Sequence, residues 1–230
     1  SAALNLVEGD SNAVDDIFVK DLDTGLVQRA SESASGEQGN ENSSNARLSA
    51  DGRKLLFSSD ADNLVANDDN GAPDLFVKDL VTGLVTRVSV SGSGAEAVGE
   101  SGPLAADWSA DGRFVVFDST ATNLVNVDGN GQRDVFVKDT VRGTIVIVSL
   151  LSDGTQGNGA SFGARISADG SQIFFQSAAT NLTGLANGAG VKALAQDALH
   201  GGDFFRGGSA LHRGVAHHPE ADDRMADQRG

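Results

Sequence analysis

The sequence has no cysteine and no tyrosine, and only three of its 230 residues are proline. Without cysteine there is neither a disulfide framework nor a thiolate metal site. Positive charge is scarce as well: 17 lysines and arginines stand against 32 aspartates and glutamates, a formal charge of −15 at pH 7. Such a surface repels a phosphate backbone and an anionic membrane alike, so we expect no nucleic acid among its partners.

Long apolar runs are missing too, since no stretch approaches the ~20 residues of a membrane helix, and we expect no membrane insertion. The chain starts at Ser1 and its single methionine is Met225, so we expect a processed protein or a part of a longer one. The 29 glycines, together with the lack of any segment of helical period, favour short strands joined by turns. The predicted fold class is all-β.

One sequence unit repeats along the chain. The dipeptide Asn-Leu recurs at steps of 58, 60 and 58 residues, at Asn5, Asn63, Asn123 and Asn181. Two further motifs keep nearly that spacing: "D-[ILV]-F-V-K-D", from Asp16, Asp74 and Asp134, and "SADG", from Ser49, Ser109 and Ser167. A period of this length indicates a repeat architecture.

Each unit is predicted to form four short strands, which is the plan of a propeller blade. In the second unit we expect strands at 46–49, 54–59, 74–80 and 84–90, the first two joined by a turn at Asp51-Gly52.

The middle strands are expected between two neighbouring blades, because "FVVF" from Phe114 and "IFFQ" from Ile173 are apolar on both faces. Successive side chains of a strand point to opposite faces. We therefore expect one blade neighbour to face Val19, Val77 and Val137, and the other to face Phe18, Phe76 and Phe136.

The order of "SADGR-x-V-x-F", "D-[ILV]-F-V-K-D", "TG" and "TRVS" resembles the WD40-like PD40 repeat of TolB-type β-propellers. The resemblance covers roughly residues 1–185. It implies a propeller fold and a secreted or periplasmic bacterial protein. The Asp box of sialidases, which also joins propeller strands, is excluded because it spaces Asp and Gly by one residue.

Counting blades predicts an incomplete propeller fragment with about two whole and two half blades. Residues 1–30 supply only the third and fourth strands of one blade, and 164–177 only the first two of another. A closed propeller needs about four to eight blades. The fragment therefore leaves blade faces open, pairs with another copy or lacks its neighbours through truncation, and we expect self-association through the open faces.

The repeat is expected to fill residues 1–180, and residues 181–230 to form a divergent, poorly ordered tail. A shifted reading frame, a recombined end and a linker all account for the break. The tail holds a histidine group that could bind zinc, although its spacing fits no known zinc motif and favours a solvated tail: His212, His217 and His218, with Asp222 and Asp223.

The loop before each "FVKD" strand carries side-chain oxygens at relative positions 1, 3 and 7, the kind of ligand that calcium prefers. These candidate calcium ligands are Asp68, Asn70 and Asp74, then Asp128, Asn130 and Asp134, and in a weaker copy Asp10, Asn12 and Asp16. The alternative is turn chemistry: Asn-Gly makes a tight turn, the first Asp caps it and the last Asp starts a strand. Both interpretations stay open on the sequence alone.

Two other features have mainly structural interpretations. Lys20, Lys78 and Lys138, each followed by Asp, are expected as charge pairs at solvent-facing strand ends. Trp108 stands where the other repeats have Leu48 and Ile166, and we expect it to fill core space.

No nucleophile elbow, phosphate loop or dinucleotide fingerprint is present, so no catalytic residues are predicted. The first hypothesis is a non-catalytic propeller fragment that binds a protein or carbohydrate ligand or acts as a scaffold, with calcium as a stabilising ion. The alternative is the propeller portion of a larger secreted enzyme, a hydrolase or lyase, whose catalytic part is absent. An active site in the propeller channel is disfavoured because the repeats are nearly identical.

Overall fold

The computed structural model describes residues 6–182 and the strand at 192–197. All regular elements of this part are β-strands, and no helix in it is long and apolar enough to span a membrane. The strands are β1 (Phe18–Lys20), β2 (Val27–Arg29), β3 (Ser43–Leu48), β4 (Lys54–Ser59), β5 (Asp74–Asp79), β6 (Val85–Arg87), β7 (Ser101–Trp108), β8 (Phe114–Ser119), β9 (Asp134–Asp139), β10 (Ile145–Ile147), β11 (Ser161–Ile166), β12 (Gln172–Ser177) and β13 (Lys192–Asp197).

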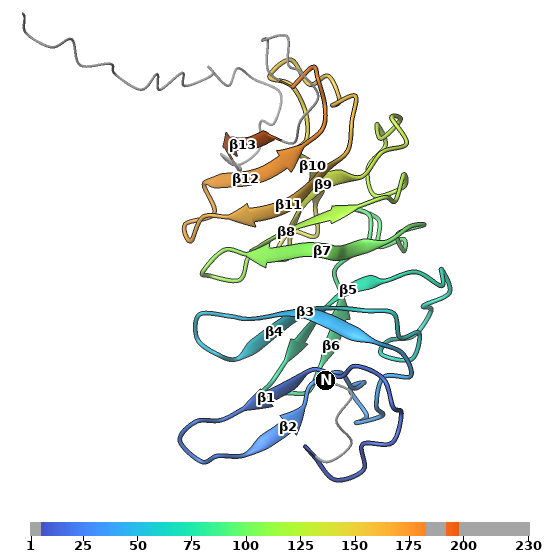
Figure 1. Cartoon of the computed structure of the whole chain (residues 1–230), viewed down its shortest axis with the longest axis vertical. Helices are drawn as coiled ribbons and strands as arrows, with labels where there is room; N and C mark the ends of the chain where they lie inside the picture. The colour runs from blue at the N-terminus through green and yellow to red at the C-terminus, as the bar shows by residue number, and fades with distance from the viewer. Residues whose placement is uncertain (1–5, 183–191, 198–230) are drawn as a thin grey trace, which may run out of the picture.

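These strands form four small antiparallel sheets that follow the repeat. The two whole sheets have the orders β3-β4-β5-β6 and β7-β8-β9-β10, β1 pairs with β2, and the last sheet has the order β11-β12-β13. Figure 1 shows the sheets stacked along the long axis of the molecule, with β1 and β2 at one end and β12 at the other. The prediction of an all-β fold built from propeller blades that do not close a ring is confirmed.

The last sheet has one strand more than the repeat pattern predicts. β13 pairs with β12 so that Asp197 lies opposite Gln172, as Asp79 of β5 lies opposite Lys54 of β4. The sequence of β13, "KALAQD", lacks the "FVKD" motif, which is why the motif did not reveal it. The predicted histidine group at 212–223 lies outside the described residues.

Strands β4, β5, β8 and β9 are buried between neighbouring sheets as expected. Phe76 packs with Phe57 toward β1, whereas Val77 packs into the next cluster, around Val115 and Phe117 of β8. Phe136 and Val137 repeat this division one sheet further along. The predicted assignment of valine and phenylalanine to opposite blade neighbours is confirmed for these two strands.

Trp108 fills core space, as predicted. Its side chain belongs to the apolar cluster between the two whole sheets and is 8% exposed. The indole Nε1–H also donates a hydrogen bond to the Leu48 carbonyl oxygen at 3.2 Å, so the side chain joins β7 to β3.

The expectation that "IFFQ" is apolar and buried on both faces is wrong for Phe174. Ile173 and Phe175 are buried against the preceding sheet, but Phe174, on the opposite face of β12, is 46% exposed. The reason is that β12 has a packed sheet on one face only.

The expectation for the lysines is also wrong in two of the three repeats. Lys78 and Lys138 are buried, and only Lys20 is exposed. The Lys138 Nζ donates to the carbonyl oxygens of Val90 and Ser91, at 2.9 and 3.2 Å, and burial lowers its pKa. Each buried lysine thus ties its strand to the loop that leaves the preceding sheet, because the Lys78 Nζ reaches Glu32 in the same way.

The lysine contact gives a prediction for stability. Lys138→Met keeps the apolar stem but removes the ammonium that donates to the Val90 and Ser91 carbonyl oxygens, so we expect the free energy of unfolding to fall by about 1–3 kcal/mol. Urea denaturation measures this, with Lys54→Met, at an exposed strand start, as a control that stays within about 0.5 kcal/mol. Equal effects of the two substitutions would contradict the role of the buried contact.

Candidate functional site

The loops before β5 and β9 end in a buried aspartate that anchors the strand. Asp74 and Asp134 are the first residues of β5 and β9, and both are fully buried. Each accepts a hydrogen bond from a serine just beyond the next strand, Ser89 or Ser149. That serine oxygen in turn accepts from the backbone N–H after the aspartate. The last Asp of the loop therefore starts the strand, as the turn interpretation predicts.

The asparagine of each loop makes the turn. The Asn70 Oδ1 accepts a hydrogen bond from the Ala72 N–H at 2.7 Å, and its Nδ2 donates to the Ala97 carbonyl oxygen at 2.9 Å. Asn130 makes the equivalent contacts with Gln132 and Gly157. The turn-forming group is thus the asparagine, and the first aspartate is left for other contacts.

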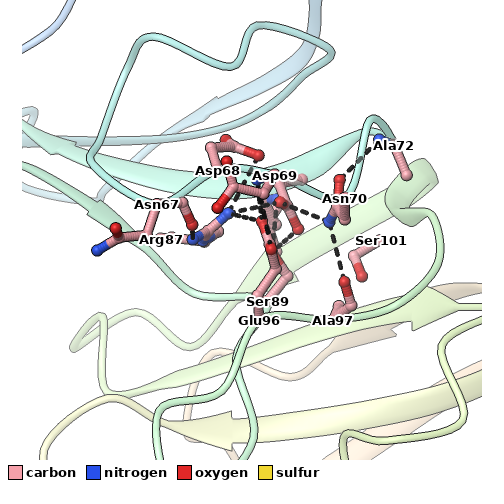
Figure 2. A network of polar contacts seen from close by, with 12 residues as sticks. Asn67, Asp68, Asp69, Asn70, Ala72, Arg87, Ser89, Glu96, Ala97 and Ser101 are labelled. Atoms are coloured by element: carbon pink, nitrogen blue, oxygen red, sulfur yellow. Dashed lines mark hydrogen bonds and ion pairs between the residues drawn. The ribbon is translucent and has the colours of Figure 1, made fainter.

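In the second loop, the first aspartate binds an arginine (Figure 2). The Arg87 Nη1 lies 3.1 Å from Asp68 Oδ1 and 3.0 Å from Asp74 Oδ2, and it also pairs with Glu96. The three carboxylates offer oxygen atoms that all lie within 4.8 Å of one another. A guanidinium therefore supplies positive charge at the place where the sequence suggests a cation.

The carboxylates of this cluster are strongly affected by burial. Burial and the neighbouring Asp74 charge outweigh the attraction of Arg87 and raise the pKa of Asp68 to about 7. Burial also raises the pKa of Asp74, although its hydrogen bonds from Ser89 and Arg87 oppose the shift. At pH 7 the Asp68 carboxyl is therefore close to half protonated, beside the Arg87 guanidinium.

The three loops differ in the residue that stands at the position of Arg87. In the first, Arg29 holds the place of Arg87, and its Nη1 lies 3.5 Å from Asp10 Oδ1. In the third, that place is taken by Ile147, and the place of Glu96 by Gln156.

In the third loop an amide therefore bridges the two carboxylates. The Gln156 Nε2 donates to Asp128 Oδ1 and to Asp134 Oδ2, at 2.9 Å each. Burial raises the pKa of Asp134, and the Asp128 Oδ2 is buried and has no hydrogen-bond partner in the structure. The structure thus brings together the predicted ligands Asp128 and Asp134, but it turns Asn130 to the backbone.

Sequence reasoning missed the arginines and the residues at Glu96 and Gln156. The signal was present, because Arg29 and Arg87 precede the "S" of "RAS" and "RVS" in the first two repeats, whereas the third reads "IVS". The change could be read only once the strand pairing placed these residues beside the loops.

A second candidate site lies where the inner strands β3, β7 and β11 end. A hollow of about 310 Å³ opens there, lined by exposed Arg47 and Leu48 and by Asp107, Trp108 and Ile166, among others. It lies at a position where the repeats differ, since Leu48, Trp108 and Ile166 are equivalent residues. The hollow combines an aromatic ring, a guanidinium and a carboxylate.

The raised pKa of Asp68 predicts a pH dependence of stability. The ordinary value is 3.8, so the folded chain binds this proton more tightly than the unfolded chain. The contribution of Asp68 to the free energy of unfolding therefore falls as the pH rises from about 4 to about 7. We expect Asp68→Asn to flatten the profile in this window, measured by urea denaturation at successive pH values.

The control for this prediction is Asp23→Asn, at an exposed turn position between β1 and β2. We expect its profile to follow that of the unaltered chain. A profile of Asp68→Asn that runs parallel to both would show that Asp68 does not titrate in this window.

No family model and no curated protein matches the chain. Similar solved structures include the tricorn protease, with 17% identity, a TM-score of 0.45 and coverage of 70% of this chain and 13% of that one. A putative TolB from Agrobacterium tumefaciens has 16% identity, a TM-score of 0.37 and coverage of 72% and 62%. An oligogalacturonate lyase in complex with manganese has 14% identity, a TM-score of 0.40 and coverage of 70% and 35%.

The chain spans less than two thirds of the length of each of these three proteins. The similarity to them is one of fold only, and they differ in activity among themselves. Membership of the PD40 repeat family stays a prediction.

Proposed function

We propose that the chain is a non-catalytic propeller fragment that binds a protein or carbohydrate ligand, in the periplasm or outside a bacterial cell. The observation that carries this is the hollow at the ends of β3, β7 and β11, where otherwise similar repeats diverge. The buried carboxylates of the loops support it, because Asp74 and Asp134 serve to hold strands in place and are buried away from any substrate.

The chemistry of the hollow favours a ligand with both a flat apolar face and an acidic group. Exposed Leu48 and half-buried Ile166 give the hollow an apolar wall, to which the largely buried Trp108 adds little surface. Arg47 is exposed on the rim, and its planar guanidinium suits a carboxylate. An acidic oligosaccharide or an acidic peptide segment has these properties.

Ligand binding can be followed directly because Trp108 is the only tryptophan of the chain. We expect a saturable change of its fluorescence on titration with acidic oligosaccharides or acidic peptides, and a weaker one with neutral analogues. Arg47→Ala should weaken the binding of the acidic ligand by about tenfold, the effect of one charged hydrogen bond.

Arg142→Ala is the matched control, since Arg142 is exposed on the turn between β9 and β10. It should leave the affinity unchanged. No saturable change with any ligand class would contradict binding at the hollow, and breakdown of a bound ligand would favour an enzyme instead.

We further propose that calcium binds the third loop, at Asp128 and Asp134, in preference to the other two. The first two loops already have an arginine among their carboxylates, whereas the third has only the neutral Gln156. Asp128 Oδ2 has no hydrogen-bond partner in the structure, but the same holds for Asp10 Oδ2 and Asp68 Oδ2, so the choice rests on the missing arginine. With few carboxylates, the dissociation constant is expected near the ~10⁻⁴ to 10⁻³ M of extracellular modules.

Calorimetric titration and melting curves with millimolar calcium test this proposal. Calcium at ten times the dissociation constant should add about 1.4 kcal/mol to the free energy of unfolding. Asp128→Asn should abolish the effect, Asp68→Asn should retain it, and Gln156→Glu, which copies Glu96, should raise the affinity several-fold. The absence of heat in both the unaltered chain and Gln156→Glu would leave only the turn interpretation.

A further inference from the structure

The stack of sheets leaves an apolar face uncovered at each end. Phe174 of β12 is 46% exposed, whereas Leu56 and Val116, which hold the same place in β4 and β8, are fully buried. Leu48 of β3 is 50% exposed, whereas Trp108 at the same place in β7 is 8% exposed. Within residues 6–182 and 192–197, neither end has the neighbouring sheet that covers the equivalent residues elsewhere, and such apolar patches mark interaction surfaces.

The two ends hold complementary halves of one blade. β1 and β2 correspond to the third and fourth strands of a whole sheet, and β11 and β12 to the first and second. In the whole sheets, Phe57 lies beside Phe76 and Phe117 beside Phe136, with ring centroids 5.8 and 6.0 Å apart. In the half blades, Phe175 of β12 corresponds to Phe57, and Phe18 of β1 corresponds to Phe76. Strands β12 and β1 lie at opposite ends of the stack (Figure 1).

We propose that a second copy of this chain completes the blade, with β1 and β2 of each copy added to β12 of the other. Each copy then contributes two whole sheets and two halves, so two copies close a ring of six blades, inside the range of about four to eight. Joining the halves within one chain gives only three blades, below that range. Another copy of the chain is the proposed occupant of the open faces.

The register of the shared blade follows from the whole sheets. Phe76 lies opposite Phe57, and Val77 opposite Leu56. The same register places Phe18 of one copy opposite Phe175 of the other, and Val19 opposite Phe174. The exposed Phe174 then faces the other copy's β3, where Leu48 is exposed, so one contact covers both apolar patches.

β13 occupies the edge of β12 that this pairing needs, so β1 of the other copy has to displace it. β13 has Leu194 and Ala195 where β5 has Phe76 and Val77, in the same register. β1 has the phenylalanine and valine of the repeat at these positions, as Phe18 and Val19. Aromatic and β-branched residues suit a buried strand better than alanine.

The first test is the mass in solution. Gel filtration with light scattering should give about 47 kDa, twice the 23.5 kDa of one chain, at micromolar concentration and above. Phe174→Gln should weaken the dimer by about tenfold or more, because it removes a phenyl ring from each of two contacts. Val81→Gln, at a residue 73% exposed on the turn between β5 and β6, is the matched control and should leave the dimer intact.

The second test is a crosslink, which the lack of cysteine in the chain makes specific. Asp79 lies opposite Lys54, so the register places Asp21 of one copy opposite Gln172 of the other. Asp21→Cys with Gln172→Cys should give a covalent dimer on oxidation, seen by non-reducing gel electrophoresis. The pair Asp21→Cys with Gln176→Cys is out of register and should crosslink much less.

A monomer at all concentrations would overturn the proposal, as would equal crosslinking of the two cysteine pairs. A series of larger species without a limit would show open-ended association through the same faces, which also contradicts a closed pair of copies. The crosslink in register, together with a mass of two chains, is the result that supports it.

Discussion

Burial of both faces of each middle strand is the constraint on which this structure depends. A strand such as β8 has Val115 and Phe117 on one face and Val116 on the other, and neither face can be covered by its own sheet. Stability is therefore a property of neighbouring sheets together, as in other repeat architectures. Phe174 holds the same place in the pattern as Val116 but is exposed, because no sheet among the described residues covers that face of β12.

Polar contacts between the sheets fix how they stack. Apolar packing alone is non-directional, whereas the Trp108 Nε1–H needs the Leu48 carbonyl oxygen and the Lys138 Nζ needs two carbonyl oxygens of the preceding loop. A buried ammonium is tolerated because backbone oxygens replace the water that it loses. These contacts join neighbouring sheets at fixed positions, and the Trp108 contact lies beside the hollow between β3, β7 and β11.

The sequence predicted the strands well because their signals are local. β4 occupies 54–59 as predicted, and β5 begins at the predicted Asp74, since each signal is a turn followed by a short apolar run. The buried state of Lys78 and Lys138 could not be predicted in this way, because their partners lie 46 to 48 residues earlier in the chain. β13 could not be predicted either, since its pairing with β12 does not use the repeat motif.

The candidate loops were found by spacing, but their chemistry depends on residues from other strands. The second loop combines three carboxylates with one guanidinium, and the third combines two carboxylates with a neutral amide, so both carry a formal charge of −2. The distribution differs, because Arg87 lies among the carboxylates of the second loop. The same formal charge is therefore partly offset by an ion pair in one repeat and, at Asp128 and Asp134, is met only by hydrogen bonds. Asn70 and Asn130 form the same turn in both loops. The residue that faces the carboxylates differs, because Ile147 stands in the third repeat where the second has Arg87.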